Sequence, residues 1–292
     1  MQKAIPINPK GIQIYQLCSS LNDKTDFKFC RANFDKPQIL DDPIQRNLFN
    51  IVWLKKGNAR YQIDFKSYEL NQGAIFFLNP GQMFQVESEE VQQGCRLAFS
   101  QDFHCVETHH KATACNGALF NNVYKLPYII PSEAIVSELE HILQKMLEEL
   151  ENPDYGHQEL LQSYLQSFLL LAVRHMNAEK NDDDNDFLRN FSFLVEKNYR
   201  KFHQVSDYAD LLGIASKTLT KKIKQYHHKT PSDVIKERLI LEAKRDLYYT
   251  NKQVKEIAYD LGFEDPAYFN RFFKKEAGVA PNRFREQSHA KQ

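Results

Sequence analysis

The carboxy-terminal part of the chain contains one pattern twice, and this repeat restricts the possible folds more than any other feature. The nine residues VSDYADLLG start at Val205, and VKEIAYDLG starts 49 residues later at Val254. Three further matches occur at an offset of 50: Leu219 with Phe269, Lys224 with Lys274, and Pro231 with Pro281. A period of this length indicates two copies of one supersecondary unit that pack together.

Each copy has the pattern of a helix-turn-helix. The first helix carries a small residue, Ala209 or Ala258, which allows the second helix to cross closely, and a glycine follows at the tight turn. We expect Ser216 and Asp265 to cap the second helices. The buried faces of these helices are predicted to be Leu219, Ile223 and Tyr226 in the first copy and Phe269, Phe272 and Phe273 in the second.

The opposite faces of the two second helices are predicted to contact DNA. The expected contact residues are Ser216, Lys217, Thr220, Lys221 and Lys224 in the first copy, and Ala267, Asn270, Arg271 and Lys274 in the second. Arginine and lysine can read guanine and asparagine can read adenine, whereas lysines at the outer ends hold phosphates. A solvated cationic face is the alternative for either helix alone, but two copies at a fixed offset argue against it.

Between the copies, apolar residues recur at every fourth position and predict one long helix from Pro231 to about Tyr249. These residues are Ile235, Leu239, Ala243 and Leu247. A helix of about 19 residues spans about 28 Å at 1.5 Å per residue. This length approaches the pitch of B-DNA, about 34 Å, so the two second helices could enter successive major grooves on one face.

The formal net charge of the chain is zero, but its two parts differ in sign. Residues 1–186 contain 17 Lys and Arg against 25 Asp and Glu, and residues 187–292 contain 21 against 13. The acidic, polar segment 177–186 predicts a solvated linker between them. A domain of net charge +8 is suited to phosphates, although basic domains also meet acidic proteins and membranes.

The sequence VKEIAYDLGFEDPAYFNRFFKKEAGVAPNRFR, which starts at Val254, resembles the signature of the AraC/XylS family of transcriptional regulators. The resemblance implies that residues 187–289 form the DNA-binding domain of that family. One departure from the family pattern is Ala280, which stands where a serine often precedes Pro281. This position lies off the face that is predicted to read DNA.

Residues 10–125 contain short apolar runs separated by Gly, Pro and Asn turns, which predicts a series of short β-strands. The runs are 48–54, 59–65, 74–78 and 94–99. The turn spacing between residues 56 and 82 resembles the cupin-like sensor barrel of the same family, which implies a ligand in the mouth of the barrel. Four aromatic residues could line such a pocket or could fill the barrel core: Trp53, Tyr61, Phe76 and Phe84.

The barrel segment lacks the ligand set of metal-dependent cupins, since Phe84 stands where a histidine is often found. A separate cluster fits no usual zinc spacing, and a polar loop after a strand is the simpler interpretation of it: His104, Cys105, His109 and His110. The five cysteines form no CxxC pair, which argues against a zinc ribbon and a secreted disulfide scaffold. We therefore expect no metal, no cofactor and no catalytic residue.

Two amphipathic helices are predicted over residues 131–176, the first with Ser132 as its N-cap and the second over 157–176. The apolar stripe of the first helix contains Ile135, Leu139, Ile142 and Met146. This stripe could pack against the barrel or the second helix, or it could form a dimer interface. The pattern alone does not choose between these.

The sequence thus predicts an α+β multidomain chain. A cupin-like β-barrel occupies residues 1–130, a helical hairpin 131–176 and an acidic linker 177–186. An all-α domain of two helix-turn-helix units joined by a long helix occupies 187–292.

The predicted function is sequence-specific regulation of transcription by a ligand-responsive protein that is not an enzyme. The expected partners are double-stranded promoter DNA, a small-molecule effector and a second copy of the chain, with RNA polymerase as a further candidate. No apolar run reaches the roughly 20 residues of a membrane span and the start has no signal-peptide core, so we expect a cytoplasmic protein. Two alternatives stay open: a cupin-type enzyme and a ligand-independent DNA-binding protein.

Overall fold

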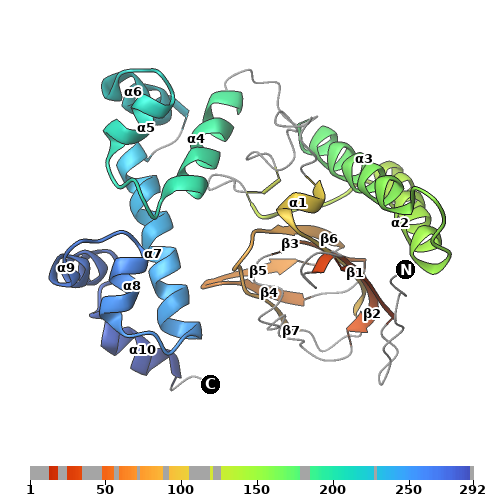
Figure 1. Ribbon diagram of the computed structural model, residues 1–292, viewed down its shortest axis with the longest axis horizontal. Helices are drawn as coiled ribbons and strands as arrows, with labels where there is room; N and C mark the ends of the chain where they lie inside the picture. The colour runs from red at the N-terminus through yellow and green to blue at the C-terminus, as the bar shows by residue number, and fades with distance from the viewer. Residues whose placement is uncertain are drawn as a thin grey trace. The chain divides into compact units, whose positions relative to one another are not determined.

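The computed structural model describes most of the chain and divides it into two compact units. The described residues are 13–18, 25–34, 48–55, 59–70, 73–87, 92–104, 119–120, 126–177, 185–226 and 229–289. The first unit holds the described residues up to 177, and the second holds those from 185 onward. Figure 1 shows the elements of each unit.

The first unit is built on two antiparallel sheets. The strand order of the larger sheet is β1 (Gln13–Cys18), β2 (Thr25–Phe34), β8 (Gln92–Phe99), β3 (Phe49–Leu54), β6 (Ala74–Leu78) and β9 (Tyr128–Ile129). The order of the smaller sheet is β5 (Lys66–Leu70), β4 (Ala59–Ile63) and β7 (Phe84–Glu87). A short helix, α1 (Gln101–His104), follows β8.

Both faces of the larger sheet are covered, which explains why its central strands are apolar throughout. All six residues of β3 and all five of β6 are buried. Successive side chains of a strand point to opposite faces. Phe49, Ile51 and Trp53 therefore pack on the side of the helical hairpin, whereas Val52 and Leu54 pack against the smaller sheet.

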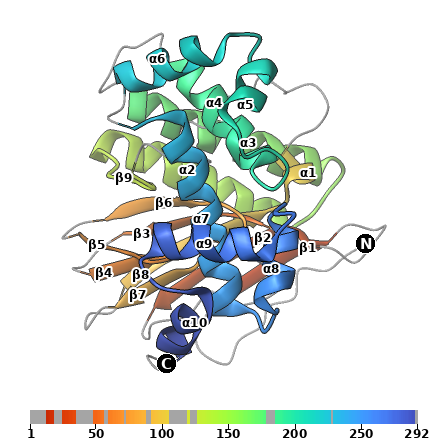
Figure 2. The ribbon, with the colours of Figure 1, turned by 90° about the vertical axis from the view of Figure 1, so that its left-hand side faces the viewer.

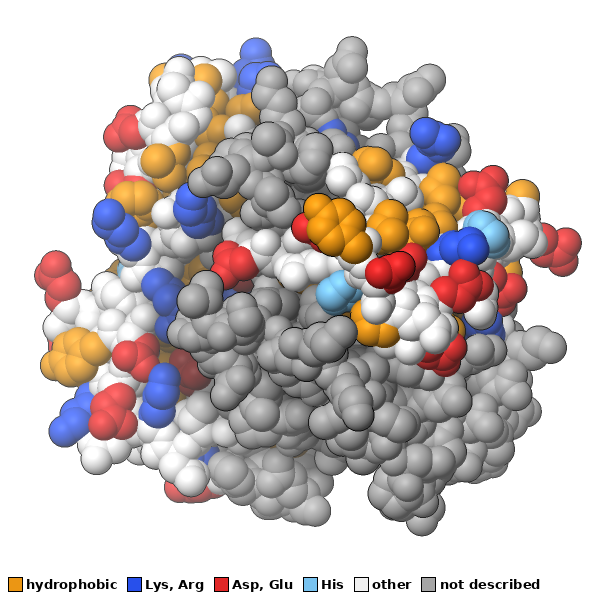
Figure 3. Space-filling view, turned by 45° about the vertical axis from the view of Figure 1, so that its right-hand side comes forward, with side chains coloured by type: hydrophobic (Ala, Val, Ile, Leu, Met, Phe, Trp, Pro, Cys, Tyr) orange, Lys and Arg blue, Asp and Glu red, His pale blue; other side chains and the backbone are white. Residues whose placement is uncertain are grey.

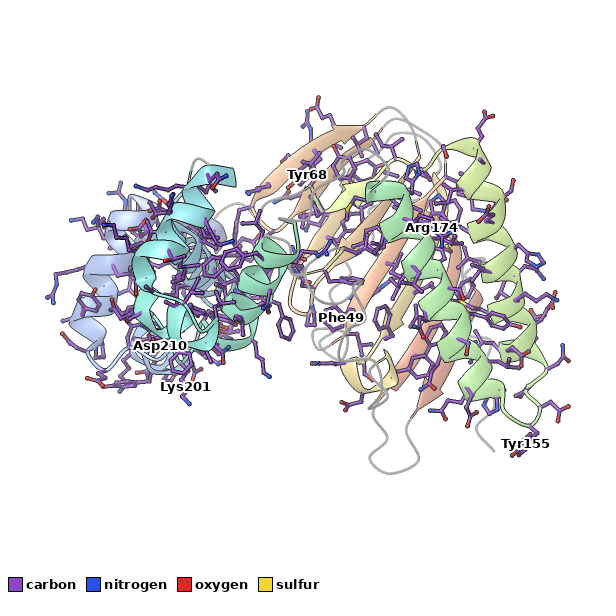
Figure 4. All side chains as sticks on the ribbon, turned by 90° about the horizontal axis from the view of Figure 1, so that it is seen from above. Phe49, Tyr68, Tyr155, Arg174, Lys201 and Asp210 are labelled. Atoms are coloured by element: carbon purple, nitrogen blue, oxygen red, sulfur yellow. The ribbon has the colours of Figure 1, made fainter. Side chains whose placement is uncertain are left out.

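The helical hairpin consists of α2 (Glu133–Glu151) and α3 (His157–Asn177), which lie side by side in Figures 1 and 2. Ser132 occupies the N-cap position of α2, as predicted, but its side chain makes no capping hydrogen bond. On the outer side of this region, acidic, basic and hydrophobic side chains are mixed (Figure 3). Tyr155, at the turn between the helices, points away from the unit (Figure 4).

The second unit is entirely helical in its described part and has a core of its own. Its helices are α4 (Asn185–Asn198), α5 (Val205–Leu211), α6 (Ser216–Tyr226), α7 (Pro231–Tyr249), α8 (Val254–Asp260), α9 (Pro266–Ala277) and α10 (Pro281–His289). The predicted bounds of the long helix are confirmed by α7. Figures 1 and 2 show α5 and α6 at one end of α7, and α8, α9 and α10 at the other.

Thr230 begins α7 with a reciprocal cap, because its hydroxyl accepts from the Asp233 amide and the Asp233 carboxylate accepts from the Thr230 amide. These hydrogen bonds lower the pKa of Asp233. The proline at the first helical position, Pro231, supplies a backbone that is already restricted to helical φ. No helix in the described part of the chain is long and apolar enough to cross a membrane.

Candidate nucleic-acid interface

The repeat folds as two helix-turn-helix units, α5–α6 and α8–α9, as predicted. The turn glycines Gly213 and Gly262 have φ values of 65° and 80°, in the left-handed region that glycine adopts without strain. The small residues Ala209 and Ala258 are buried, at 1% and 0% exposure, where the two helices of each unit meet. The pattern of alanine and glycine therefore has the physical role that the sequence indicated.

The two second helices begin differently. Asp265 caps α9, and its carboxylate accepts hydrogen bonds from the amides of Ala267 (2.8 Å) and Tyr268 (3.1 Å). The prediction that Ser216 caps α6 is wrong, because Ser216 is already the first helical residue. The carbonyl of Ala215 accepts the first helical bond, from the amide of Leu219. The connection between α5 and α6 is one residue shorter than the connection between α8 and α9, so the position before α6 is an alanine.

The inner faces of α6 and α9 pack into the core of the second unit. Leu219, Ile223, Phe269 and Phe273 are completely buried, as predicted. Phe272 is partly buried against the same core, and the side chain of Tyr226 lies outside the described residues. The helices are thus fixed to the unit along one side, which leaves their other side to the surface.

The outer faces contain the residues that the sequence selected. In α6, Ser216, Lys217, Lys221 and Lys224 are exposed, whereas Thr220 is half-buried. The Thr220 hydroxyl donates to the carbonyl of Ser216 at 2.9 Å, which turns it toward its own helix. In α9, all four predicted residues are exposed: Ala267, Asn270, Arg271 and Lys274.

The polar side chains of α9 are oriented by local contacts but keep hydrogen-bonding groups available for another partner. The amide nitrogen of Asn270 donates to the carbonyl of Pro266 at 3.0 Å, which leaves its side-chain oxygen directed elsewhere. The guanidinium of Arg271 lies 3.9 Å from the Asp265 carboxylate, a long contact between exposed groups. Such a contact is weak in water, so the guanidinium can exchange it for a nucleic-acid acceptor.

One surface residue beside this face was not predicted. Tyr268 is 56% exposed, and the guanidinium of Arg271 lies 5.9 Å from the centre of its ring. Its position three residues before Arg271 places the two on neighbouring turns of α9, which could have been found from the helical spacing. Lys222, which the sequence did not select, instead lies over the ring of Phe187 at 4.8 Å.

The four aromatic residues proposed for a ligand pocket do not share one. Trp53 faces the hairpin, with its ring 6.4 Å from that of Phe168. Tyr61, Phe76 and Phe84 pack on one another between the two sheets and are at most 1% exposed. The correction follows from the two-residue period of a strand, because Trp53 is on the opposite face of β3 from the residues that face the smaller sheet.

The interior between the two sheets also contains polar groups. The Arg96 guanidinium donates to the Asn50 side-chain oxygen, and the Asn50 amide donates to the Leu48 carbonyl at 2.9 Å. The Tyr61 hydroxyl is buried and has no hydrogen-bond partner in the described structure. Burial raises the pKa of Tyr61, so the hydroxyl stays protonated.

A cavity of about 320 Å³ lies on the other face of the larger sheet, against α2. Its lining consists of Phe29, Lys55, Gly94, Cys95, Glu140, His141, Leu143, Gln144 and Leu147. An ion pair of 2.6 Å joins Lys55 to Glu140 beside this cavity. None of the four aromatic residues predicted for the pocket is among this lining.

The apolar stripe of α2 is covered by the same chain. Leu139 and Met146 are completely buried, and Ile135 and Ile142 pack partly buried against the same core of sheet and hairpin. Of the alternatives that the sequence left open, packing within the protomer accounts for this stripe. Leu139 and Met146 are therefore not available for contact with a second copy.

The histidine and cysteine cluster falls mostly outside the described residues, which end this segment at His104 and exclude Cys105, His109 and His110. Among the described residues, no group of three or more His, Cys, Asp or Glu side chains could hold a metal ion.

Comparisons with known proteins match both units of the chain. Residues 208–287 match the model of a helix-turn-helix domain, and residues 42–169 match that of an AraC-like ligand binding domain. Over 261 residues the chain is 33% identical to the HTH-type transcriptional activator RhaS of Mannheimia succiniciproducens, covering 87% of this chain and 95% of that protein. RhaS of Yersinia pestis (strain Pestoides F) is 20% identical over 255 residues, covering 86% and 91%.

Among solved structures, ToxT from Vibrio cholerae is similar over 94% of this chain and 98% of its own, with 18% identity and a TM-score of 0.42.

Proposed function

The chain belongs to the AraC/XylS family of transcriptional regulators, and from this premise we propose that α6 and α9 read two successive major grooves of promoter DNA. The chain is a DNA-binding regulator of transcription with a ligand-binding domain and a helix-turn-helix domain. We propose which side chains contact bases and which contact phosphates. Lys217 and Lys221 of α6 and Asn270 and Arg271 of α9 are assigned to base edges, and Lys224 and Lys274, at the outer ends of the two helices, are assigned to phosphates.

The observation that carries this assignment is the equivalence of the two outer faces. Both helices belong to the same repeat, both bury an apolar side in one core, and both expose polar and basic residues on the other. One α-helix of 19 residues separates the two units, which is about 28 Å at 1.5 Å per residue. That length is compatible with half-sites about one turn of DNA apart.

Further partners are supported by the relatives of the chain. The named relatives are transcriptional activators, which supports RNA polymerase as a second macromolecular partner and the cytoplasm as the place of action. A homodimer remains our proposal, but it has to use a surface other than the buried residues Leu139 and Met146.

The effector is proposed to bind between the two sheets of the first unit. Of the four predicted pocket residues, Tyr61 supports this best, because its buried hydroxyl lacks a partner in the described structure. A buried hydroxyl without a partner costs free energy, and a polar ligand beside it would supply the missing hydrogen bond. Phe76 and Phe84 then supply the apolar wall beside it.

A comparison of two variants tests the DNA contacts. The site protected by the full chain is first located by footprinting of upstream DNA, and affinities are then measured by fluorescence anisotropy over a salt series. Arg271→Ala is expected to relax the base preference at one position of the site and to cost about 1–3 kcal/mol. Lys224→Ala is expected to weaken binding to all sequences alike and to reduce the salt slope by about 1.

Equal effects of the two substitutions on base preference would contradict the assignment of roles. Affinity that is indifferent to both salt and sequence would contradict DNA recognition by this surface altogether.

A further inference from the structure

The two turn glycines are equivalent in the sequence repeat but not in their surroundings. A methyl group added at Gly213 would meet nothing within 4 Å. A methyl group added at Gly262 would overlap the carbonyl oxygen of Arg200 and would lie 3.4 Å from the ring nitrogen of His203. The turn of the second helix-turn-helix, at Gly262, is therefore in backbone contact with the turn between α4 and α5, residues 199–203. The turn of the first helix-turn-helix, at Gly213, has no such neighbour.

Side chains of this α4–α5 turn donate hydrogen bonds to two carbonyls at the C-terminal end of α8. The Nη1 of Arg200 donates to the carbonyl of Asp260 at 3.1 Å. The Nε2 of His203 donates to the carbonyl of Leu261 at 2.9 Å. The C-terminal end of α8 leaves such carbonyls without helical partners, so these hydrogen bonds satisfy groups that would otherwise need water.

Arg200 also joins this contact to the long helix. Its Nη2 donates to Glu242 of α7 at 2.7 Å, and its Nε donates to the hydroxyl of Tyr199 at 3.0 Å. Glu242 is in turn held by Arg238 at 2.9 Å. A single guanidinium thus links the end of α4, the middle of α7 and the end of α8.

The α4–α5 turn is attached to the first helix-turn-helix unit as well. The hydroxyl of Tyr208 in α5 donates to the carbonyl of Phe202 at 3.0 Å, and its ring packs edge-on against Phe191 of α4. On the other side, Phe263 follows Gly262 directly, and its ring lies 5.2 Å from that of Phe269 in α9. A chain of contacts therefore joins α5 of the first helix-turn-helix to α9 of the second, and this chain does not include a residue of α7.

We propose that the α4–α5 turn fixes the separation and angle between α6 and α9, so that the protein accepts one spacing between its two DNA half-sites. Arg200, His203 and Gly262 are then positioning residues for DNA recognition, although none of them belongs to the face that meets DNA. The proposal rests on the proposed function, in which each of the two helices reads one groove.

The physical reason is that α7 alone is a weak spacer. Each helix-turn-helix packs on its own end of α7, and because helices bend, this packing alone leaves the angle between α6 and α9 dependent on the straightness of α7. One base pair moves a half-site by about 3.4 Å along the DNA axis and rotates it by roughly 35°. The direct contact between the α4–α5 turn and the turn at Gly262 adds to the packing on α7 and prevents the two helix-turn-helix units from following such a displacement.

The experiment measures spacing preference in the full chain. Footprinting locates the two half-sites, and duplexes are made with the natural spacing and with one base pair inserted between them. The readout is the ratio of the affinities for the two duplexes, measured with the same protein preparation. A fraction of unfolded protein lowers both apparent affinities by the same factor and therefore does not change the ratio. For the unmodified chain we expect the insertion to weaken binding on the order of 10-fold or more.

Gly262→Ala and Arg200→Ala are expected to reduce this ratio to within about 3-fold. In these variants the helix-turn-helix α8–α9 can move with the displaced half-site. The repeat provides a matched control, since Gly213→Ala introduces the same backbone strain without a neighbour to displace. Lys201→Ala removes a positive charge from the same turn, at the rim of the unit (Figure 4). Both controls are expected to keep the ratio of the unmodified chain.

Three results would overturn the proposal. The unmodified chain could be indifferent to spacing, Arg200→Ala could keep the original ratio, or Gly213→Ala could lower it as much as Gly262→Ala does. Arg200→Ala keeps the test decisive if Gly262→Ala does not fold. Failure of the proposed function has a different signature, since footprinting of upstream DNA would then find no protected half-sites from which to design the duplexes.

Discussion

At the scale of single residues, the two recognition helices show that a sequence repeat need not repeat its local chemistry. Asp265 holds the first amides of α9 with its carboxylate, whereas the corresponding position before α6 is Ala215, which has no side chain able to accept. An N-cap of this kind satisfies backbone donors that have no helical partner and places a negative charge at the positive end of the helix. The start of α9 therefore depends on one side chain, and the start of α6 does not.

Removal of this cap is expected to cost stability in α9 only. Asp265→Ala should lower the free energy of unfolding by about 1 kcal/mol, because two amides lose their acceptor. Ser216→Ala is the matched control and should change it by less than about 0.5 kcal/mol, since Ser216 lies within the helix. Urea unfolding of the full chain, followed by circular dichroism, measures both. A similar loss in the two variants would show that Asp265 does not act as a cap.

At the scale of elements, α7 is held to α4 by charges as well as by its apolar side. Arg238 is 6% exposed and forms two hydrogen bonds with Glu196 of α4, at 2.6 and 2.8 Å, while its guanidinium lies 3.9 Å from the ring centre of Tyr199. Glu242 completes the group by accepting from Arg238 and Arg245. Removing one partner of a buried pair is strongly destabilising, because the other charge is then left without compensation.

This group predicts a pH dependence of stability. Burial alone would raise the pKa of Glu242, but Arg238, Arg245 and Arg200 lower it to about 2. Because the pKa is lower in the folded state than the ordinary value of 4.5, the ionised carboxylate stabilises the fold above pH 4.5, and this contribution is lost as the pH falls toward 2.

Glu242→Gln should therefore destabilise the chain on the order of 3 kcal/mol at neutral pH and by much less near pH 2. The difference in unfolding free energy between the variant and the unmodified chain is measured by urea titration at several pH values. Glu237→Gln is the control, because its pair with Lys229 is exposed and should be worth less than about 1 kcal/mol at any pH. A difference that stays constant between pH 7 and pH 2 would contradict the proposed role of Glu242.

At the scale of the whole molecule, the chain consists of two units with separate cores and opposite net charge. One core lies between the larger sheet and the hairpin, a second lies between the two sheets, and a third joins the helices of the second unit. An effector that binds the first unit and changes DNA affinity must, by thermodynamic linkage, bind with an affinity that depends on DNA.

The buried hydroxyl of Tyr61 gives a test of where the effector binds. Tyr61→Phe should leave the melting temperature of the ligand-free chain unchanged or raise it, because it removes a buried polar group that lacks a partner in the described structure. The same variant should retain less of any small molecule that co-purifies with the unmodified chain, as measured by mass spectrometry after denaturation. A clear fall in the ligand-free melting temperature would show that the hydroxyl has a structural partner and would contradict its role in effector binding.

The sequence by itself determined the architecture of the second unit. The repeat at offsets of 49 and 50 predicted both helix-turn-helix units, and the four-residue period of apolar residues predicted α7 with its observed bounds. It also selected exposed residues on α6 and α9, because a helix with one apolar side must turn its other side outward. These features depend on local spacing, which is fully contained in the order of the residues.

The tertiary structure alone decided which segments distant in the sequence come together. Only the fold shows that Trp53 faces the hairpin rather than the smaller sheet, and that Leu139 and Met146 are covered by their own chain. Only the fold distinguishes Gly262, which contacts the α4–α5 turn, from its sequence equivalent Gly213. The physical reason is that the face of a strand or helix that becomes buried is set by its neighbours, and those neighbours are chosen by packing rather than by local pattern.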